Sequence, residues 1–213
     1  MHKWEHYFPV YERYFSRWRN KTCLFIEIGV SKGGSLQVWK EFFGPFATIV
    51  GVDIDPKCAA IGIEGVNIRI GDQSDLNFLS KIVDEFGAPD IVIDDGSHQM
   101  AHLGVTFEFL YPKLSKNGIY LVEDLHTCYW EEYGGGVGKE KNFLNQSKHL
   151  VDALNAVHSR GAISETFFSK NTLGIHFYDS IAVFERGSVT RKNAPITGKA
   201  EQEQFGSLKK LFK

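Results

Sequence analysis

The chain has 213 residues, of which 43% are hydrophobic and 23% charged, and its formal net charge at pH 7 is −2. This length and composition are typical of one soluble globular domain with a sizeable core. The near-neutral charge excludes the strongly basic field of many nucleic-acid-binding domains. No apolar run approaches the roughly 20 residues that span a bilayer, so we expect neither a nucleic acid nor a membrane as partner.

The cysteines and the N-terminal sequence indicate where the protein resides. Cys23, Cys58 and Cys128 are widely separated and form no C-x-x-C pair. An odd number of cysteines without a regular framework is typical of a reducing compartment. The N-terminal residues are too polar for a secretory signal peptide. We therefore expect a cytoplasmic protein.

Apolar runs alternate with helix-like stretches in the first two thirds of the chain. The runs predict five strands, at Leu24–Ile28, Thr48–Ile54, Val66–Ile70, Ile91–Ile93 and Ile119–Val122. The stretches between them predict helices through Trp39 and Phe43, from Asp55-Pro56, from a Ser74 cap through Phe86, and over Met100–Leu110. Such alternation is typical of βαβ units, so we expect a parallel sheet covered by helices on both faces.

The pattern changes after Trp130. A glycine-rich loop over residues 131–138 precedes a helix predicted around Leu144–Val157. Two apolar runs, Gly174–Tyr178 and Ile181–Phe184, then flank Asp179-Ser180, which predicts an antiparallel hairpin. The predicted fold is thus α/β and Rossmann-like, with a seven-stranded, mostly parallel sheet and an antiparallel C-terminal hairpin.

Three regions are expected along the chain. Residues 1–20 are rich in aromatic side chains and predict a helical cap, which packs over one edge of the sheet, covers the active site, or does both. Residues 21–186 form the main α/β domain. Residues 187–213 are polar and contain several lysines, so they predict a tail that is frayed or docked on a partner.

Acidic residues follow two of the predicted strands. Asp94-Asp95-Gly96-Ser97-His98 follows the fourth strand, and Glu123-Asp124 follows the fifth. Because the carboxyl ends of parallel strands meet at one edge of a sheet, and a buried unpaired carboxylate is costly, we expect these acids to share a cation. Carboxylate oxygens are the ligands that Mg²⁺ prefers, and Mn²⁺ and Ca²⁺ also accept them. A plain turn before a capped helix explains Gly96 and Ser97 but neither acidic pair.

The loop after the first strand indicates the type of cofactor. It reads Glu27-Ile-Gly29-Val-Ser31-Lys-Gly33-Gly34-Ser35, and Ser31 stands where the dinucleotide fingerprint has its second glycine. A pyrophosphate needs that glycine, so a cofactor without phosphates fits better, and we expect S-adenosylmethionine. A tight turn without any ligand is the alternative.

Further candidates for cofactor contacts lie at the strand ends. A carboxylate at Asp53 can accept both hydroxyls of a ribose, Ile54 can pack on adenine, and Asp72-Gln73 can bind the adenine amino group or form a plain turn. The complete set of predicted cofactor-binding residues is Glu27, Gly29, Gly34, Ser35, Asp53, Ile54, Asp72, Gln73 and Asp94.

Taken together, these motifs resemble the class I metal-dependent sugar O-methyltransferases of the mycinamicin and macrocin type. The resemblance runs as far as Val183–Glu185 and rests on Trp4–Tyr7, Val10–Arg13, Glu27–Ser35, Gly51–Pro56, Asp94–His98 and Val122–Asp124. It implies methyl transfer from S-adenosylmethionine to a hydroxyl of a small-molecule acceptor, a sugar or glycoside with vicinal hydroxyls. Cephalosporin-hydroxylase-like proteins share much of this architecture.

The resemblance also implies residue roles. Asp95, Glu123 and Asp124 would bind Mg²⁺, and His98 would act as the catalytic base. His126 is a rival base, whereas the remaining histidines considered are expected on the surface or in the core: His102, His149 and His158. The mycinamicin-type enzyme has a large additional N-terminal region, so its macrolide specificity and its oligomer do not carry over to this chain.

Other functions remain as alternatives. A catechol-type O-methyltransferase uses a similar fold and Mg²⁺ and differs in its acceptor. A non-catalytic subunit that binds S-adenosylmethionine has no need of a metal and a base, and an NAD-dependent oxidoreductase lacks both the glycine it needs and a use for the acids. The expected partners are a small-molecule acceptor and, if the chain self-associates, further copies of itself. Tyr129-Trp130 and the following glycine-rich loop form either a lid or a linker.

Overall fold

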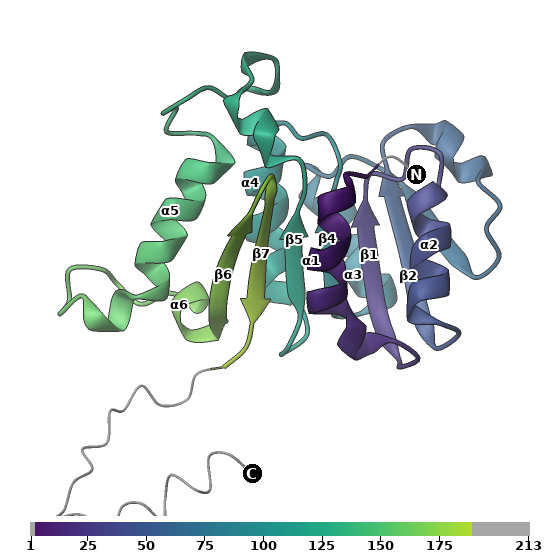
Figure 1. The fold of residues 1–213 in the computed structure, drawn as a ribbon, viewed down its shortest axis with the longest axis horizontal. Coiled ribbons are helices and arrows are strands. Elements are labelled where there is room, and N and C mark those ends of the chain that lie inside the picture. Colours follow the sequence, from purple (N-terminus) through teal and green to yellow (C-terminus); the bar gives the residue numbers. More distant parts are fainter. Residues whose placement is uncertain (1–2, 189–213) are drawn as a thin grey trace, which may run out of the picture.

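The computed structural model describes residues 3–188, which form one seven-stranded sheet between layers of helices (Figure 1). The strand order is β3-β2-β1-β4-β5-β7-β6. The strands are β1 (Cys23–Ile28), β2 (Ala47–Asp53), β3 (Val66–Ile70), β4 (Ile91–Asp94), β5 (Ile119–Val122), β6 (Thr172–Tyr178) and β7 (Ile181–Arg186). The first five are parallel, and β7 pairs antiparallel with both β5 and β6. The predicted fold is confirmed.

Helices cover both faces of the sheet. The α-helices are α1 (Phe8–Phe15), α2 (Gly34–Phe43), α3 (Leu76–Phe86), α4 (Met100–Leu110), α5 (Phe143–Leu154) and α6 (Phe167–Asn171). Short 3₁₀ turns are η1 (Glu5–Tyr7), η2 (Ser16–Trp18), η3 (Pro56–Ala60), η4 (Tyr111–Lys113), η5 (Leu125–Tyr129), η6 (Glu131–Tyr133) and η7 (Ala156–His158). Each helix within residues 3–188 is too short or too polar to cross a lipid bilayer.

Alternation along the strands divides the core in two. Successive strand residues point to opposite faces, so Phe25 packs with α1 and α2 whereas Ile26 packs with α3, α4 and α5. In Figure 1, α1 and α2 lie in front of the sheet and α4 lies behind it. The same alternation sends Glu27 and Glu123 to the α1 side and Asp94 to the α4 side. This division decides which acids meet.

The N-terminal helix lies on a face of the sheet and not over an edge. Tyr11 and Phe15 of α1 are buried with Phe25 and Ile93, which belong to the two central strands β1 and β4 (Figure 1). The prediction of an edge position was therefore wrong, because the apolar side of α1 covers the middle of the sheet, next to Trp39 of α2. This position brings α1 to the carboxyl ends of the strands.

Two local predictions also differ from the structure. The helix predicted at Asp55-Pro56 is the short 3₁₀ turn η3, whose N-cap is Asp55. The N-cap of α3 is Asp75, whose side chain accepts from the backbone of Asn77, and not Ser74, which donates to Asp72 instead. The predicted polar tail lies, from residue 189 onward, outside the described residues.

Candidate active site

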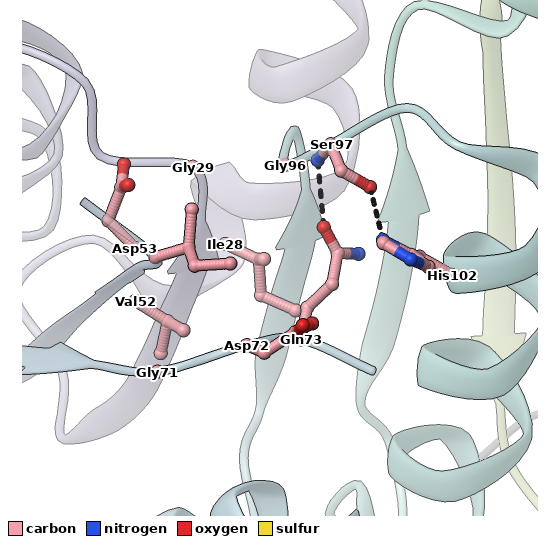
Figure 2. Close-up of a pocket in the computed structure, with 11 residues that line it drawn as sticks. Ile28, Gly29, Val52, Asp53, Gly71, Asp72, Gln73, Gly96, Ser97 and His102 are labelled. Carbon is pink, nitrogen blue, oxygen red and sulfur yellow. Dashed lines mark hydrogen bonds between the residues drawn. The ribbon is translucent and has the colours of Figure 1, made fainter. Parts of the chain in front are cut away.

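A cavity of about 150 Å³ opens at the carboxyl ends of β1, β2 and β3 (Figure 2). Its lining includes five of the predicted cofactor-binding residues, namely Gly29, Asp53, Ile54, Asp72 and Gln73, together with residues that the sequence did not single out for this role: Ile28, Val52, Gly71, Gly96, Ser97 and His102. This edge lies where the strand order reverses, between β1 and β4, which is the usual ligand position in open α/β sheets.

A second cavity, of about 410 Å³, is also lined by the loop after β1. Gly29 lines both cavities, and the second is also lined by Lys3, Val30, Ser31, Lys32, Gly34, Ser35 and Asp95. The backbone of Gly29 has φ +98°, and a Cβ there would lie 2.0 Å from the carbonyl oxygen of Asp95. Only glycine allows the loops after β1 and β4 to approach this closely.

Asp53 holds the loop after β1 from the end of β2. Its Oδ2 accepts from the backbone N–H groups of Val30 and Ser31, each at 2.9 Å, and its Oδ1 accepts from that of Asp55 at 2.9 Å. Burial alone would raise the pKa of Asp53, but these three hydrogen bonds outweigh it and lower that pKa below its ordinary value. Asp53 is thus an ionised acceptor at the cavity wall.

Gln73 connects the floor of the first cavity to β4 through hydrogen bonds. Its Oε1 accepts from Ser97 N at 2.8 Å (Figure 2). Its Nε2 donates to Asp94 Oδ1 at 3.0 Å and to Thr106 Oγ1 at 3.2 Å. Asp94 also accepts from Tyr120 and is fully buried, and this burial raises its pKa to about 6. Asp94 therefore lies on the α4 side beneath the cavity and does not line it.

Five charged or phenolic side chains meet on the α1 side of the strand ends. Lys3 Nζ lies 2.7 Å from Asp95 Oδ2, 2.9 Å from Glu123 Oε2 and 3.1 Å from Glu27 Oε1. Tyr11 donates to Glu123 Oε1 at 2.7 Å. Burial, together with the neighbouring Glu123 charge, raises the pKa of Asp95 to about 8, and burial raises that of Glu123 to about 7. Sequence reasoning missed Lys3, which precedes every recognised motif.

Glu27 has no free oxygen toward the cavities. Its Oε2 accepts from Ser35 at 2.7 Å and its Oε1 from Trp39 Nε1 at 3.2 Å, and Oε1 also forms an ion pair with Lys3. Glu27 lines neither cavity, whereas its partners Ser35 and Lys3 both line the second one, and its contact with the cofactor stays a prediction.

His98 lies beside two of the predicted metal ligands. Its Nε2 is 3.9 Å from Asp95 Oδ1 and 3.8 Å from Asp124 Oδ2, and Asp124 Oδ1 accepts from Tyr7 at 2.7 Å. Burial lowers the pKa of His98, which favours the neutral imidazole that a base requires. Within the described part of the chain, His98 Nδ1 is the one buried side-chain nitrogen or oxygen without a hydrogen-bond partner.

The donor set fits a divalent cation that prefers oxygen. Ligand atoms of Asp95, His98 and Asp124 all lie within 4.8 Å of one another. Glu123 bonds to Lys3 and Tyr11 and is not part of this group, so the structure brings two of the three predicted carboxylate ligands together with the predicted base. Two carboxylates with room for further oxygens suit Mg²⁺, which keeps positions for water or substrate.

One of the other histidines does not lie in the surroundings that we expected for it. His126, the rival base, bonds through Nδ1 to Ser180 Oγ at 2.6 Å, and its ring contacts Trp4 and Trp130. His102, which we expected on the surface or in the core, lines the smaller cavity and bonds to Ser97 Oγ at 2.9 Å (Figure 2). The signal for His102 was available, because it lies one helical turn after the acidic motif.

The fold is the α/β methyltransferase fold. Superposition on the solved structure of the MycE methyltransferase of the mycinamycin biosynthetic pathway, in complex with Mg and SAH, gives a TM-score of 0.83 at 33% identity and covers 98% of this chain and 57% of that one. A second complex of the same enzyme, with Mg, SAH and mycinamycin VI, also gives 0.83, at 32% identity over 98% of this chain and 56% of that one. No protein-family model matches the chain.

Curated relatives point to the same group of enzymes. The chain is 37% identical over 197 residues to mycinamicin VI 2''-O-methyltransferase of Micromonospora griseorubida, covering 85% of this chain and 48% of that protein. It is 35% identical over 195 residues to demethylmacrocin O-methyltransferase of Streptomyces fradiae, covering 85% and 49% respectively. The chain spans about half the length of the curated relatives it matches. These relatives are sugar O-methyltransferases, which confirms the resemblance predicted from the sequence.

Proposed function

We propose that the protein transfers the methyl group of S-adenosylmethionine to a hydroxyl of a sugar or glycoside, with help from a bound divalent cation. The observation that carries the proposal is the double position of Asp95, which lines the second cavity and also belongs to the group formed with His98 and Asp124. A methyl donor in that cavity and an acceptor hydroxyl at His98 would therefore both lie next to Asp95. The relatives' activities support this assignment.

The two cavities together suit an extended cofactor. The smaller cavity has apolar walls at Ile28 and Val52 and an ionised acceptor at Asp53, which suits adenine and a ribose with two hydroxyls. The larger cavity, next to Ser31 and Ser35, would take the methionine part. Gly29, which lines both, would lie under the junction between the two parts.

The metal site would activate the acceptor. Asp95 and Asp124 would hold the cation, and Glu123 would join them if its carboxylate turns from Lys3. Such a cation lowers the pKa of a hydroxyl bound to it. His98, kept neutral by burial, would take the proton from the acceptor hydroxyl, and Tyr7 would hold Asp124 in place through their hydrogen bond.

A row of aromatic rings leads outward from His98 and would contact the acceptor. Ring centroids are 6.3 Å apart for His98 and Tyr133, 5.9 Å for Tyr133 and Trp130, 4.8 Å for Trp130 and His126, and 6.2 Å for His126 and Trp4. Trp4 and Trp130 are exposed. Aromatic faces suit the C–H side of a sugar ring and an apolar group attached to it. This aromatic row supports a glycoside as the acceptor.

Calorimetric titration with S-adenosylhomocysteine, in Mg²⁺ and again in chelator, tests the cofactor assignment, with NAD as the control. We expect binding of S-adenosylhomocysteine and none of NAD. Failure of S-adenosylhomocysteine to bind in either buffer would overturn the proposal. If it binds, turnover on glycosides with vicinal hydroxyls tests the reaction, and binding without turnover on any acceptor would favour a non-catalytic subunit.

The aromatic row also favours a second candidate acceptor. A catechol presents two adjacent hydroxyls on a flat ring, which aromatic side chains can stack against. Parallel assays with a catechol and a glycoside distinguish the two, because the sugar assignment predicts methylation of the glycoside at a clearly higher kcat/KM.

A further inference from the structure

Lys3 is a buried cation within the acidic cluster. Its side chain is 3% exposed, and its ammonium lies within 3.1 Å of oxygens of Glu27, Asp95 and Glu123. The ammonium donates hydrogen bonds to Asp95 and Glu123 and forms an ion pair with Glu27, so it is matched by three carboxylates. No other Lys or Arg in residues 3–188 pairs with these acids.

Lys3 and the group around His98 use different oxygens of Asp95. Lys3 binds Oδ2, whereas Oδ1 faces His98 on the side of Asp124. The carboxylate of Asp95 therefore lies between two cation positions, an inner one filled by the ammonium and an outer one suited to a metal. Glu123 is on the inner side, where Lys3 and Tyr11 hold its two oxygens.

The charges of these side chains affect the stability of the cluster with and without a bound metal. Three carboxylates, those of Glu27, Asp95 and Glu123, surround the ammonium of Lys3, and a fourth, that of Asp124, lies on the other side of the group beside His98. Without a counter-ion these desolvated acids would repel one another, and a divalent cation on the outer side would be repelled by the ammonium. Lys3 should thus stabilise the cluster without metal more than it stabilises the cluster with metal.

We propose that Lys3 is the internal cation of the metal site. Lys3 shares Asp95 with the divalent cation, and its charge sets how tightly that cation binds. The inference rests on the metal site of the proposed function and adds a role for the N-terminal segment. Lys3 holds Asp95 and Glu123 in place before the metal arrives, and it lowers the affinity of the cluster for metal. The N-terminal segment thereby becomes part of the metal site.

The test is a comparison of Lys3→Met with Lys81→Met in the full chain. Lys81 is exposed on α3, so its variant makes the same change of net charge away from the cluster. Mg²⁺ affinity is measured by calorimetry at pH 8.5, without cofactor or acceptor. We expect Lys3→Met to bind Mg²⁺ at least tenfold more tightly than the wild type, which corresponds to about 1.4 kcal/mol, and Lys81→Met to bind it as the wild type does.

Thermal unfolding of the same proteins gives an independent readout. In chelator, Lys3→Met should unfold at a lower temperature than the wild type, and saturating Mg²⁺ should raise its Tm by more than it raises that of the wild type. If Lys3→Met does not fold without metal, Lys3→Gln serves as a second neutral variant, because its amide can still donate to one carboxylate.

The outcomes separate this inference from the proposed function. Unchanged or weaker Mg²⁺ binding by the neutral variants would overturn the role of Lys3 and leave the metal site standing. Absence of Mg²⁺ binding by the wild type and by the Lys3 variants would instead remove the metal from the proposed function, and this inference would fall with it.

Discussion

At the scale of single residues, His98 is the side chain whose chemistry the structure defines best. It lies between Asp95 and Asp124, and its Nδ1 has no partner among the described residues. We expect His98→Ala to lower kcat by about 10²–10⁴-fold, the usual contribution of a positioned base. Binding of S-adenosylhomocysteine, measured by calorimetry, should stay within about threefold of the wild type. A loss of this affinity as large as the loss of kcat would contradict the role of His98 as the base.

The rate should also depend on pH through the same imidazole. Burial lowers the pKa of His98, so the neutral base persists to a lower pH than for an ordinary histidine. The rate should fall only as the solution becomes more acidic than the ordinary His pKa of about 6.5. A pH profile of kcat/KM on an accepted glycoside checks this at saturating Mg²⁺, which keeps the carboxylates ionised. Under that condition, a fall that begins above pH 7 would speak against His98 as the base.

Asp95 lines the second cavity and also belongs to the group with His98 and Asp124, so the proposed function gives its substitution a specific signature. Asp95→Asn removes one charge from the group and should weaken Mg²⁺ binding by at least tenfold, whereas Asp84→Asn, on the exposed side of α3, should leave it unchanged. Calorimetry with Mg²⁺ measures both. Equal Mg²⁺ affinities of the two variants would show that the metal does not bind at Asp95.

At the scale of elements, the contact between the loops after β1 and β4 depends on Gly29. Gly29→Ala adds a Cβ that would lie 2.0 Å from a backbone oxygen, at φ +98°, so the two loops must separate. Gly87→Ala is a matched control, because its φ is +93° but nothing lies within 4 Å of the added Cβ. Both variants should lose about 1 kcal/mol to the backbone conformation.

Only Gly29→Ala should in addition weaken S-adenosylhomocysteine binding, because Gly29 lines both cavities. Denaturant unfolding and calorimetry on the two variants separate the effects. Similar ligand affinities for Gly29→Ala and Gly87→Ala would mean that the cofactor does not lie across this loop.

Much of this element structure could be predicted from the sequence, and the reason is local. Strand β3 was predicted at its observed bounds because its apolar residues alternate with polar ones and Gly71 follows directly. The two acidic motifs come at the ends of β4 and β5, which are apolar and buried throughout. Alternation along β4 also predicts the direction of the Asp94 side chain, which points away from that of Asp95. Asp94 was predicted to contact the cofactor, and in the structure it is buried and lines neither cavity.

The contacts of the N-terminal segment could not be predicted in the same way. Lys3 meets Asp95 and Glu123 across 92 and 120 residues of chain, and no periodicity connects positions so far apart. Tyr11 was recognised only as one of many aromatic residues. Its hydroxyl reaches Glu123 because α1 lies on a face of the sheet, which depends on tertiary packing.

At the scale of the whole molecule, the buried acids tie stability to pH. In the folded protein the pKa of Asp95 is raised to about 8 and that of Glu123 to about 7, both above their values in the unfolded chain. Between about pH 4.5 and pH 8 the folded state therefore binds more protons than the unfolded state, so these groups make stability fall as pH rises.

Bound Mg²⁺ should oppose that loss, because it favours the ionised carboxylates. We expect the Tm gain caused by saturating Mg²⁺ to grow between pH 5.5 and pH 8, as measured by thermal unfolding with and without chelator. A gain that shrinks over this range would show that the cation does not bind at these acids.

The depth at which Lys3 is buried has a practical consequence for handling the protein. A tag joined ahead of Met1 would be only two residues away from Lys3, which contacts Glu27, Asp95 and Glu123. The imidazoles of a polyhistidine tag bind divalent metals, so such a tag would compete for the metal close in sequence to this cluster. A tag joined after Lys213, beyond the end of β7 at Arg186, is the suitable choice for every metal titration described above.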